Sequence, residues 1–423
     1  MLRRLLSVIL LSALVLTARA QRLSVLAETP DWTRLEAFQE TITRAEFTRL
    51  LDQVYAPGDA AMGLIAVEED AAAIKTTLEP EAVFRLRFAK DAASAKPVPR
   101  YWRPAAALGP AKKPLAGVKI ALDPGHLGGE WARIEERFYQ IGATKPVAEG
   151  EMTLRVAELL APQLRALGAE VSFVRKSPGP TIEARPESFH EAARTELKRL
   201  GIAEPRENYD ATQLADPTRG QTVQWQSEIL FYRVAEIRHR ARIVNEEIKP
   251  DLVLCIHFNA EGWGDDPAAP VFVPRNHLHL LVNGCYSASE LRNDDVRFDM
   301  LRRLLDGSFA EEVAASGRVA DALADATKLP PYAYTTGNAL RVGDRPYIWA
   351  RNLLANRLYD APVIFLEPYV MNSQPVWERV QAGDYEGEKM VAGELRKSIY
   401  REYAAAVAAG LRAYFHETRS GGR

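Results

Sequence analysis

Two histidines and one glutamate stand at or just beyond the ends of three separate apolar runs in this chain. His126 comes one Asp-Pro-Gly turn after the first run, whereas His257 and Glu367 come directly after the second and third. In open α/β sheets, ligands bind beyond the carboxyl ends of the strands. We therefore expect these three side chains, which are far apart in sequence, to converge at one edge of a sheet.

Two imidazoles and one carboxylate leave a fourth coordination position open for water, which is the ligand set of hydrolytic zinc sites. The carboxylate could come from Glu149 or Glu151, which stand where the next helix is expected to begin. Zinc lowers the pKa of a bound water to about 7 and polarises a substrate carbonyl. A separate carboxylate must accept the water proton and return it to the leaving amine, and we expect Glu367 in that role.

The elements that must position these residues alternate between strand and helix. An apolar strand at 117–122, a helix at 152–167 closed by Gly168 and a strand at 170–174 form a βαβ unit. Further strands are expected at 252–256, 278–282 and 363–366, and further helices at 228–248, 295–326 and 393–415. This alternation predicts an α/β fold with a mixed, mostly parallel sheet flanked by helices.

The 423 residues are too many for one ordinary core and suggest several parts. Residues 1–20 combine an arginine pair, an apolar run too short to span a bilayer comfortably and an Ala-Arg-Ala site, which is typical of a cleaved signal peptide. We expect a small N-terminal α+β domain at 21–94, a Pro-, Ala- and Lys-rich linker at 95–116, and a catalytic domain at 117–423 with a large insertion at about 178–226. Localisation in the periplasm or cell envelope follows.

Composition narrows the range of partners. Hydrophobic residues make up 47% of the chain, which is typical of a globular protein. The formal net charge is −2, so no overall positive charge is available to bind nucleic acid. The only two cysteines, Cys255 and Cys285, could pair in an exported protein, although two buried thiols are the simpler interpretation.

Other histidines offer weaker candidates for a metal site. His277 and His279 share one face of an expected strand and could form a metal pair, but no carboxylate motif accompanies them, so an exposed polar sheet face is the simpler interpretation. The sequence His190-Glu-Ala-Ala-Arg194 stops one histidine short of the H-E-x-x-H motif of zinc proteases. The iron oxygenases also use two histidines and a carboxylate, but the signal peptide and Glu367 favour hydrolysis.

The surrounding motifs resemble those of the zinc-dependent N-acetylmuramoyl-L-alanine amidases. The resemblance covers roughly residues 117–415 and rests on four segments: Leu122-Asp-Pro-Gly-His-Leu-Gly-Gly129, Glu149-Gly-Glu-Met-Thr-Leu154, Cys255-Ile-His-Phe-Asn-Ala260 and Phe365-Leu-Glu-Pro-Tyr-Val-Met-Asn372. It implies zinc held by His126, Glu149 and His257, with Glu367 as the catalytic base. Glu149 is chosen over Glu151 because it stands five residues before Leu154, as the metal glutamate does in the family.

The resemblance also implies the reaction and the partners. The family cleaves the amide between the lactyl group of N-acetylmuramic acid and L-alanine, so peptidoglycan is the expected substrate. We expect a monomer, with room for a regulatory protein partner; a non-catalytic peptidoglycan-binding protein is the alternative. Arg240 matches a family arginine in a structural position. The chain departs from the pattern by the extra Leu127, by a longer segment at 130–147, and by Pro368-Tyr369, which replaces a small residue and a glycine.

Overall fold

The structure, a computed structural model, describes residues 22–78, 81–210, 216–262 and 270–420. The expected signal peptide at 1–20 lies outside these ranges. None of the described helices is both long enough and apolar enough to cross a membrane.

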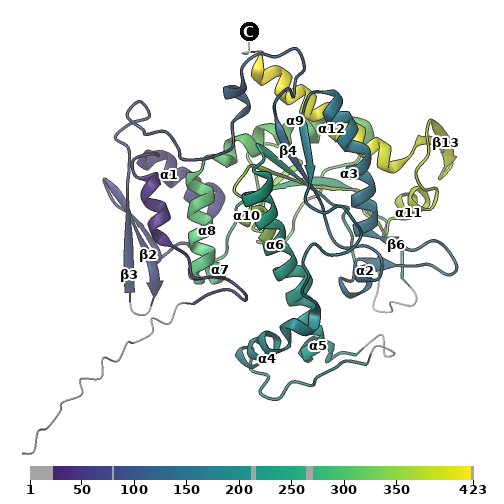
Figure 1. The fold of residues 1–423 in the computed structure, drawn as a ribbon, viewed down its shortest axis with the longest axis horizontal. Helices are drawn as coiled ribbons and strands as arrows, with labels where there is room; N and C mark the ends of the chain where they lie inside the picture. The colour runs from purple at the N-terminus through teal and green to yellow at the C-terminus, as the bar shows by residue number, and fades with distance from the viewer. Residues whose placement is uncertain (1–21, 79–80, 211–215, 263–269, 421–423) are drawn as a thin grey trace, which may run out of the picture.

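A mixed sheet of seven strands forms the centre of the described chain (Figure 1). Its order is β10 (Leu340–Arg341), β11 (Ile348–Ala350), β9 (Leu278–Val282), β12 (Val363–Pro368), β8 (Leu252–Ile256), β4 (Lys119–Pro124) and β7 (Glu170–Phe173). The pairs β12–β9 and β10–β11 are antiparallel, and the other neighbouring pairs are parallel. The expected α/β fold with a mixed, mostly parallel sheet is confirmed.

Both faces of this sheet are buried, because alternate residues of each strand enter two different cores. Ile120, Leu254 and Leu366 pack with α3 (Glu149–Ala166), α9 (Ser308–Thr327) and α12 (Ile399–Arg419). Residues one position along, such as Val253 and Phe365, pack with α6 (Glu236–Arg242) and α10 (Leu354–Leu358) on the other face. Continuous apolar runs are what a sheet covered on both faces requires.

The helix boundaries differ from the sequence expectation at three places. The helix expected at 295–326 is two helices, α8 (Asp294–Leu305) and α9, because Gly307 adopts a left-handed φ of 74° between them. The helix expected at 393–415 begins later, at Ile399, and a hairpin of β13 (Glu388–Val391) and β14 (Glu394–Lys397) precedes it. Helical backbone leading to 248 begins earlier than expected, at α5 (Val223–Ile229).

The N-terminal part contains α1 (Arg44–Leu50) and an antiparallel sheet of β1 (Ile65–Val67), β2 (Ala71–Leu78) and β3 (Glu81–Arg87). A 3-10 helix at Trp32–Phe38 precedes them, and the Thr43 side chain caps α1 by accepting the Glu46 N–H. In Figure 1 this part lies beside α8. Its buried side chains share one hydrophobic core with those of α8.

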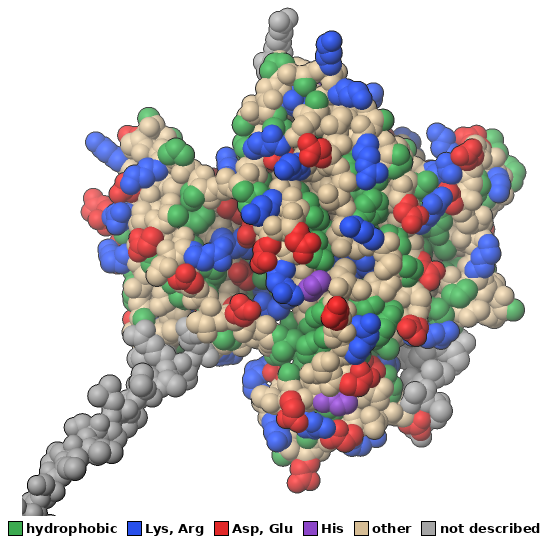
Figure 2. All heavy atoms as spheres, viewed as in Figure 1, with side chains coloured by type: hydrophobic (Ala, Val, Ile, Leu, Met, Phe, Trp, Pro, Cys, Tyr) green, Lys and Arg blue, Asp and Glu red, His purple; other side chains and the backbone are tan. Residues whose placement is uncertain are grey.

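The segment expected to be an insertion carries α4 (His190–Arg199), which packs against α5 through a small core of its own. The remaining short α-helices and strands of the described residues are α2 (Trp131–Ile134), β5 (Phe138–Tyr139), β6 (Val147–Ala148), α7 (Ala288–Leu291) and α11 (Gln374–Gln381). Both cysteines are free and buried. On the face seen in Figure 2, acidic and basic side chains are interspersed, which agrees with the low net charge.

Candidate metal centre

His126 is presented by a tight loop that leaves the end of β4. The residue itself has a left-handed φ of 56°, which is costly for a non-glycine residue and therefore needs support from its surroundings. Arg240 supplies part of that support: its buried guanidinium pairs with Asp123 at 3.0 Å and donates to the carbonyls of Pro124 and His126. The structural role that the sequence resemblance gave to Arg240 thus acts on the loop that carries His126.

Glycine is required where this loop crosses the other candidate ligands. A Cβ atom on Gly125 would lie 2.1 Å from the His257 ring, and one on Gly150 would lie 2.2 Å from the backbone of Leu127. The buried Arg175, which the sequence did not single out, donates to the carbonyls of Pro124 and Gly150 and so ties the loop to the start of α3. These close approaches hold the two histidines and α3 together.

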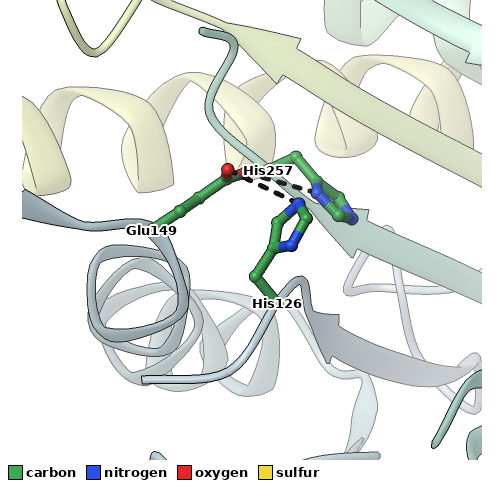
Figure 3. A group of neighbouring side chains, drawn as sticks. All are labelled: His126, Glu149 and His257. Carbon is green, nitrogen blue, oxygen red and sulfur yellow. Dashed lines mark ion pairs between the residues drawn. The ribbon is translucent and has the colours of Figure 1, made fainter. Parts of the chain in front are cut away.

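The structure brings His126, Glu149 and His257 into one cluster, although they come from the loop after β4, the first position of α3 and the residue after β8 (Figure 3). His126 Nε2 lies 3.4 Å from Glu149 Oε2, and His257 Nδ1 lies 3.3 Å from Glu149 Oε1. One ligand atom from each residue falls within 4.8 Å of the others. Glu149 opens α3, as expected, and is almost fully buried.

The cluster has the features of a metal site. Glu149 Oε1 accepts the Phe258 N–H, but Oε2 is buried without a hydrogen-bond partner among the described residues. Buried polar atoms are rarely left in this state. Burial lowers the pKa of His126, and although burial opposes ionisation of Glu149, the neighbouring histidines lower its pKa overall. Neutral imidazoles and an ionised carboxylate are the forms that bind Zn²⁺, so the residues present fit the ion.

A second carboxylate, Glu135, supports the cluster and was missed in the sequence. Its Oε2 accepts a hydrogen bond from His126 Nδ1 at 3.1 Å and another from the Leu127 N–H at 2.9 Å. Metal-binding histidines usually donate a hydrogen bond from the N–H of their second ring nitrogen to such a group, and this bond fixes the tautomer. The longer segment at 130–147 thus supplies the Glu135 carboxylate, which binds the loop at the extra residue Leu127. No motif marks Glu135.

His257 is fixed by packing more than by polar contacts. Its ring stacks on Phe365 of β12 with the centroids 4.3 Å apart, and its carbonyl accepts the Tyr403 hydroxyl of α12. Glu151, the alternative ligand, is exposed and instead accepts the Gly129 N–H. Of the two acids at the start of α3, Glu149 therefore lies in the cluster and Glu151 lies outside it.

Glu367 lines the same cavity as His126 and Glu149, which has a volume of about 250 Å³. Burial raises the pKa of Glu367 to about 7, against the lowering effect of His257. The altered residues that follow it are accommodated: Tyr369 takes the left-handed conformation, with φ 61°, at the position where the resemblance leads one to expect glycine. Its hydroxyl donates to Glu402 at 2.8 Å, which anchors the unusual turn.

His277, which precedes β9, and His279, in β9, are more buried than the sequence predicted. His277 and His279 were expected on an exposed sheet face, but only 5% and 2% of their surfaces are exposed. Both line the cavity that contains Glu367. The error arose because the antiparallel β9 brings its amino end to the site, where loops cover it.

No protein-family model and no curated protein matches the chain. Structural comparison finds N-acetylmuramoyl-L-alanine amidases, the same family that the sequence motifs resemble. Ami1 of Mycobacterium smegmatis is 16% identical over 72% of this chain and 99% of its own, with a TM-score of 0.38. AmiC2 of Nostoc punctiforme is 12% identical over 71% of this chain and 99% of its own, with a TM-score of 0.37. CwlD of Clostridioides difficile, solved with the GerS lipoprotein, is 10% identical over 71% of this chain and 99% of its own, with a TM-score of 0.36.

Proposed function

We propose that this chain is a zinc-dependent amidase that hydrolyses the bond between the lactyl group of N-acetylmuramic acid and L-alanine in peptidoglycan. One observation carries the proposal: His126, Glu149 and His257 form a cluster in which Glu149 Oε2 is buried without a hydrogen-bond partner among the described residues, and His126 and Glu149 line the same cavity as Glu367. The substrate class comes from the motif resemblance around these residues.

Each residue has a role in this proposal. His126, Glu149 and His257 would hold Zn²⁺, which supplies a Lewis acid for the scissile carbonyl and acidifies water. Glu367 accepts the proton from the attacking water and delivers it to the leaving L-alanine amine. A pKa near 7 suits a group that must do both at neutral pH. Glu135 orients His126 through its Nδ1 atom.

A synthetic muramoyl peptide tests the reaction. Zinc-loaded protein is expected to split it into a muramic acid with a free lactyl carboxylate and a peptide with a free L-alanine amine, each identified by mass. Metal analysis of protein purified without added metal separates the hydrolase from an iron oxygenase, because stoichiometric iron would contradict the proposal. Binding without cleavage by the zinc-loaded protein would favour the non-catalytic alternative.

The cellular setting is proposed on the sequence alone. A signal peptide at 1–20, removed after Ala20, would direct the protein to the periplasm or cell envelope, where its substrate lies. Cell fractionation and the N-terminal sequence of the mature protein test this. We further propose a monomer, open to a regulatory partner; sedimentation of the purified protein tests its oligomeric state.

A further inference from the structure

The cavity continues past Glu367 into a second polar group of residues that the hydrolysis above does not use. His277 and His279 of the β9 region, Tyr332, Tyr334 and Arg351 line this extension. Nδ1 of His277 and Nδ1 of His279 are buried without hydrogen-bond partners in the described ranges, whereas His277 Nε2 lies 3.4 Å from Glu261 Oε1. Leaving such atoms unpaired is costly, which points to a ligand that pairs with them.

The tautomer of His279 follows from its neighbours. Arg351 Nη1 donates to the Tyr334 hydroxyl at 3.4 Å, and the same hydroxyl lies 3.0 Å from His279 Nε2. A guanidinium can only donate, so the hydroxyl oxygen accepts from Arg351. Among the described residues the acceptor within reach of the hydroxyl hydrogen is His279 Nε2, and we assign the hydrogen to that contact. Burial, together with the neighbouring His277 and Arg351, lowers the pKa of His279 to about 3, so the ring is neutral. The single imidazole proton therefore lies on Nδ1.

Strand pairing places this donor beside the proposed base. His279 is the direct partner of Glu367 in the β9–β12 ladder, so both side chains project from the same face of the sheet. The strand order is β9, β12, β8, β4, which puts His279 on the opposite side of Glu367 from His257 and His126. Because the candidate ligands lie on the other side of Glu367, the side of His279 is the one available to the leaving amine and its peptide.

We propose that His279 is a substrate-binding residue whose Nδ1–H donates a hydrogen bond to the first peptide carbonyl on the leaving-amine side, that of L-alanine. Tyr334 and Arg351 are positioning residues that act through His279 by fixing its tautomer. The aromatic ring of Tyr332, 4.3 Å from His277 and 5.1 Å from His279 between centroids, holds both imidazoles in place. This inference rests on the proposed amidase function and adds a peptide subsite to it.

Two substrates and three variants test the subsite. One substrate is muramoyl-L-alaninamide, and the other is the muramoyl amide of (S)-2-aminobutane, which keeps the methyl branch but lacks the carbonyl. His279→Leu is expected to lower kcat/KM about tenfold to hundredfold on the first substrate and to change it little on the second. His279→Asn should retain most of the activity, because its amide nitrogen can replace Nδ1. Thermal unfolding and zinc content are compared for all variants.

Tyr334→Phe tests the tautomer with a much smaller structural change. Nitrogen-15 imidazole NMR is expected to report the Nδ1–H form of His279 in the wild type and a shift towards Nε2–H in Tyr334→Phe. A His279→Leu variant that is folded, zinc-loaded and fully active overturns the inference alone, as does an equal loss on both substrates or an Nε2–H tautomer in the wild type. If the wild type cleaves neither substrate, the amidase proposal fails, and this inference fails with it.

Discussion

His126 is held between two carboxylates, with Nε2 facing Glu149 and Nδ1 donating to Glu135. Replacing Glu135 by glutamine keeps the shape and a hydrogen-bond acceptor but removes the charge that favours the Nδ1–H tautomer. We expect Glu135→Gln to weaken zinc binding about 10- to 100-fold, measured by competition with a chelator. Glu130→Gln, in the exposed start of the same segment, is the matched control. Equal affinity of both variants would mean that Glu135 does not support the ligand.

In the proposed reaction, Glu367 is expected to make the rate pH-dependent. Its pKa is raised to about 7 by burial, so the carboxylate that accepts a proton is lost as the pH falls through that value. A bound cation nearby favours the ionised form, which moves the midpoint to pH 7 or below. We expect kcat/KM to fall on the acid side with a midpoint between about pH 5 and 7. A profile that stays flat down to pH 4.5 would be inconsistent with Glu367 as the base.

Among the individual residues, the sequence predicted those that follow the ends of strands. His126, His257 and Glu367 follow apolar runs, and such positions can be recognised without a structure. Glu135 could not be recognised, because its role depends on how the 130–147 segment folds back over the loop. The buried state of His279 was likewise hidden, since the sequence does not reveal that β9 runs antiparallel to β12.

Among the elements, the start of α3 controls the geometry of the candidate ligands. Gly150 lies where a Cβ atom would meet the Leu127 backbone at 2.2 Å, so a side chain there must push α3 away from the His126 loop. Because Glu149 is the adjacent residue, we expect Gly150→Ala to lower zinc affinity at least about tenfold and to abolish most activity. Glu158→Ala, on the exposed face of the same helix, should behave as wild type. Unchanged zinc affinity in Gly150→Ala would refute this coupling.

The element boundaries that the sequence missed depend on local backbone conformation. Apolar runs and helical spacing predicted the boundaries of the central strands and of α3 to within a few residues of those observed. The break at Gly307 and the hairpin before α12 instead depend on residues with positive φ, which occur at Gly307, Ala392 and Gly393. Only two of these three are glycines, and isolated glycines inside a helical pattern do not mark a break by themselves.

On the scale of the whole molecule, the N-terminal part and the α/β part share one core. Leu35 from the first and Leu301 of α8 from the second are both fully buried in it. We therefore expect one cooperative unfolding transition in denaturant. Leu35→Ala should lower the free energy of unfolding by about 2–5 kcal/mol and shift the entire transition, whereas Met62→Ala, at an exposed position, should not. Two separate transitions, with only one shifted by Leu35→Ala, would show that the parts unfold independently.

In its proposed function, this molecule cuts stem peptides from peptidoglycan with Glu367 as its base. The most direct measurement compares wild type with Glu367→Gln on purified sacculi, at equal protein and with zinc content confirmed to be the same. The wild type is expected to release peptides bearing a free L-alanine amine, while the variant binds zinc but releases at least about a hundredfold less. Equal release by both proteins, or no release by the zinc-loaded wild type, would contradict it.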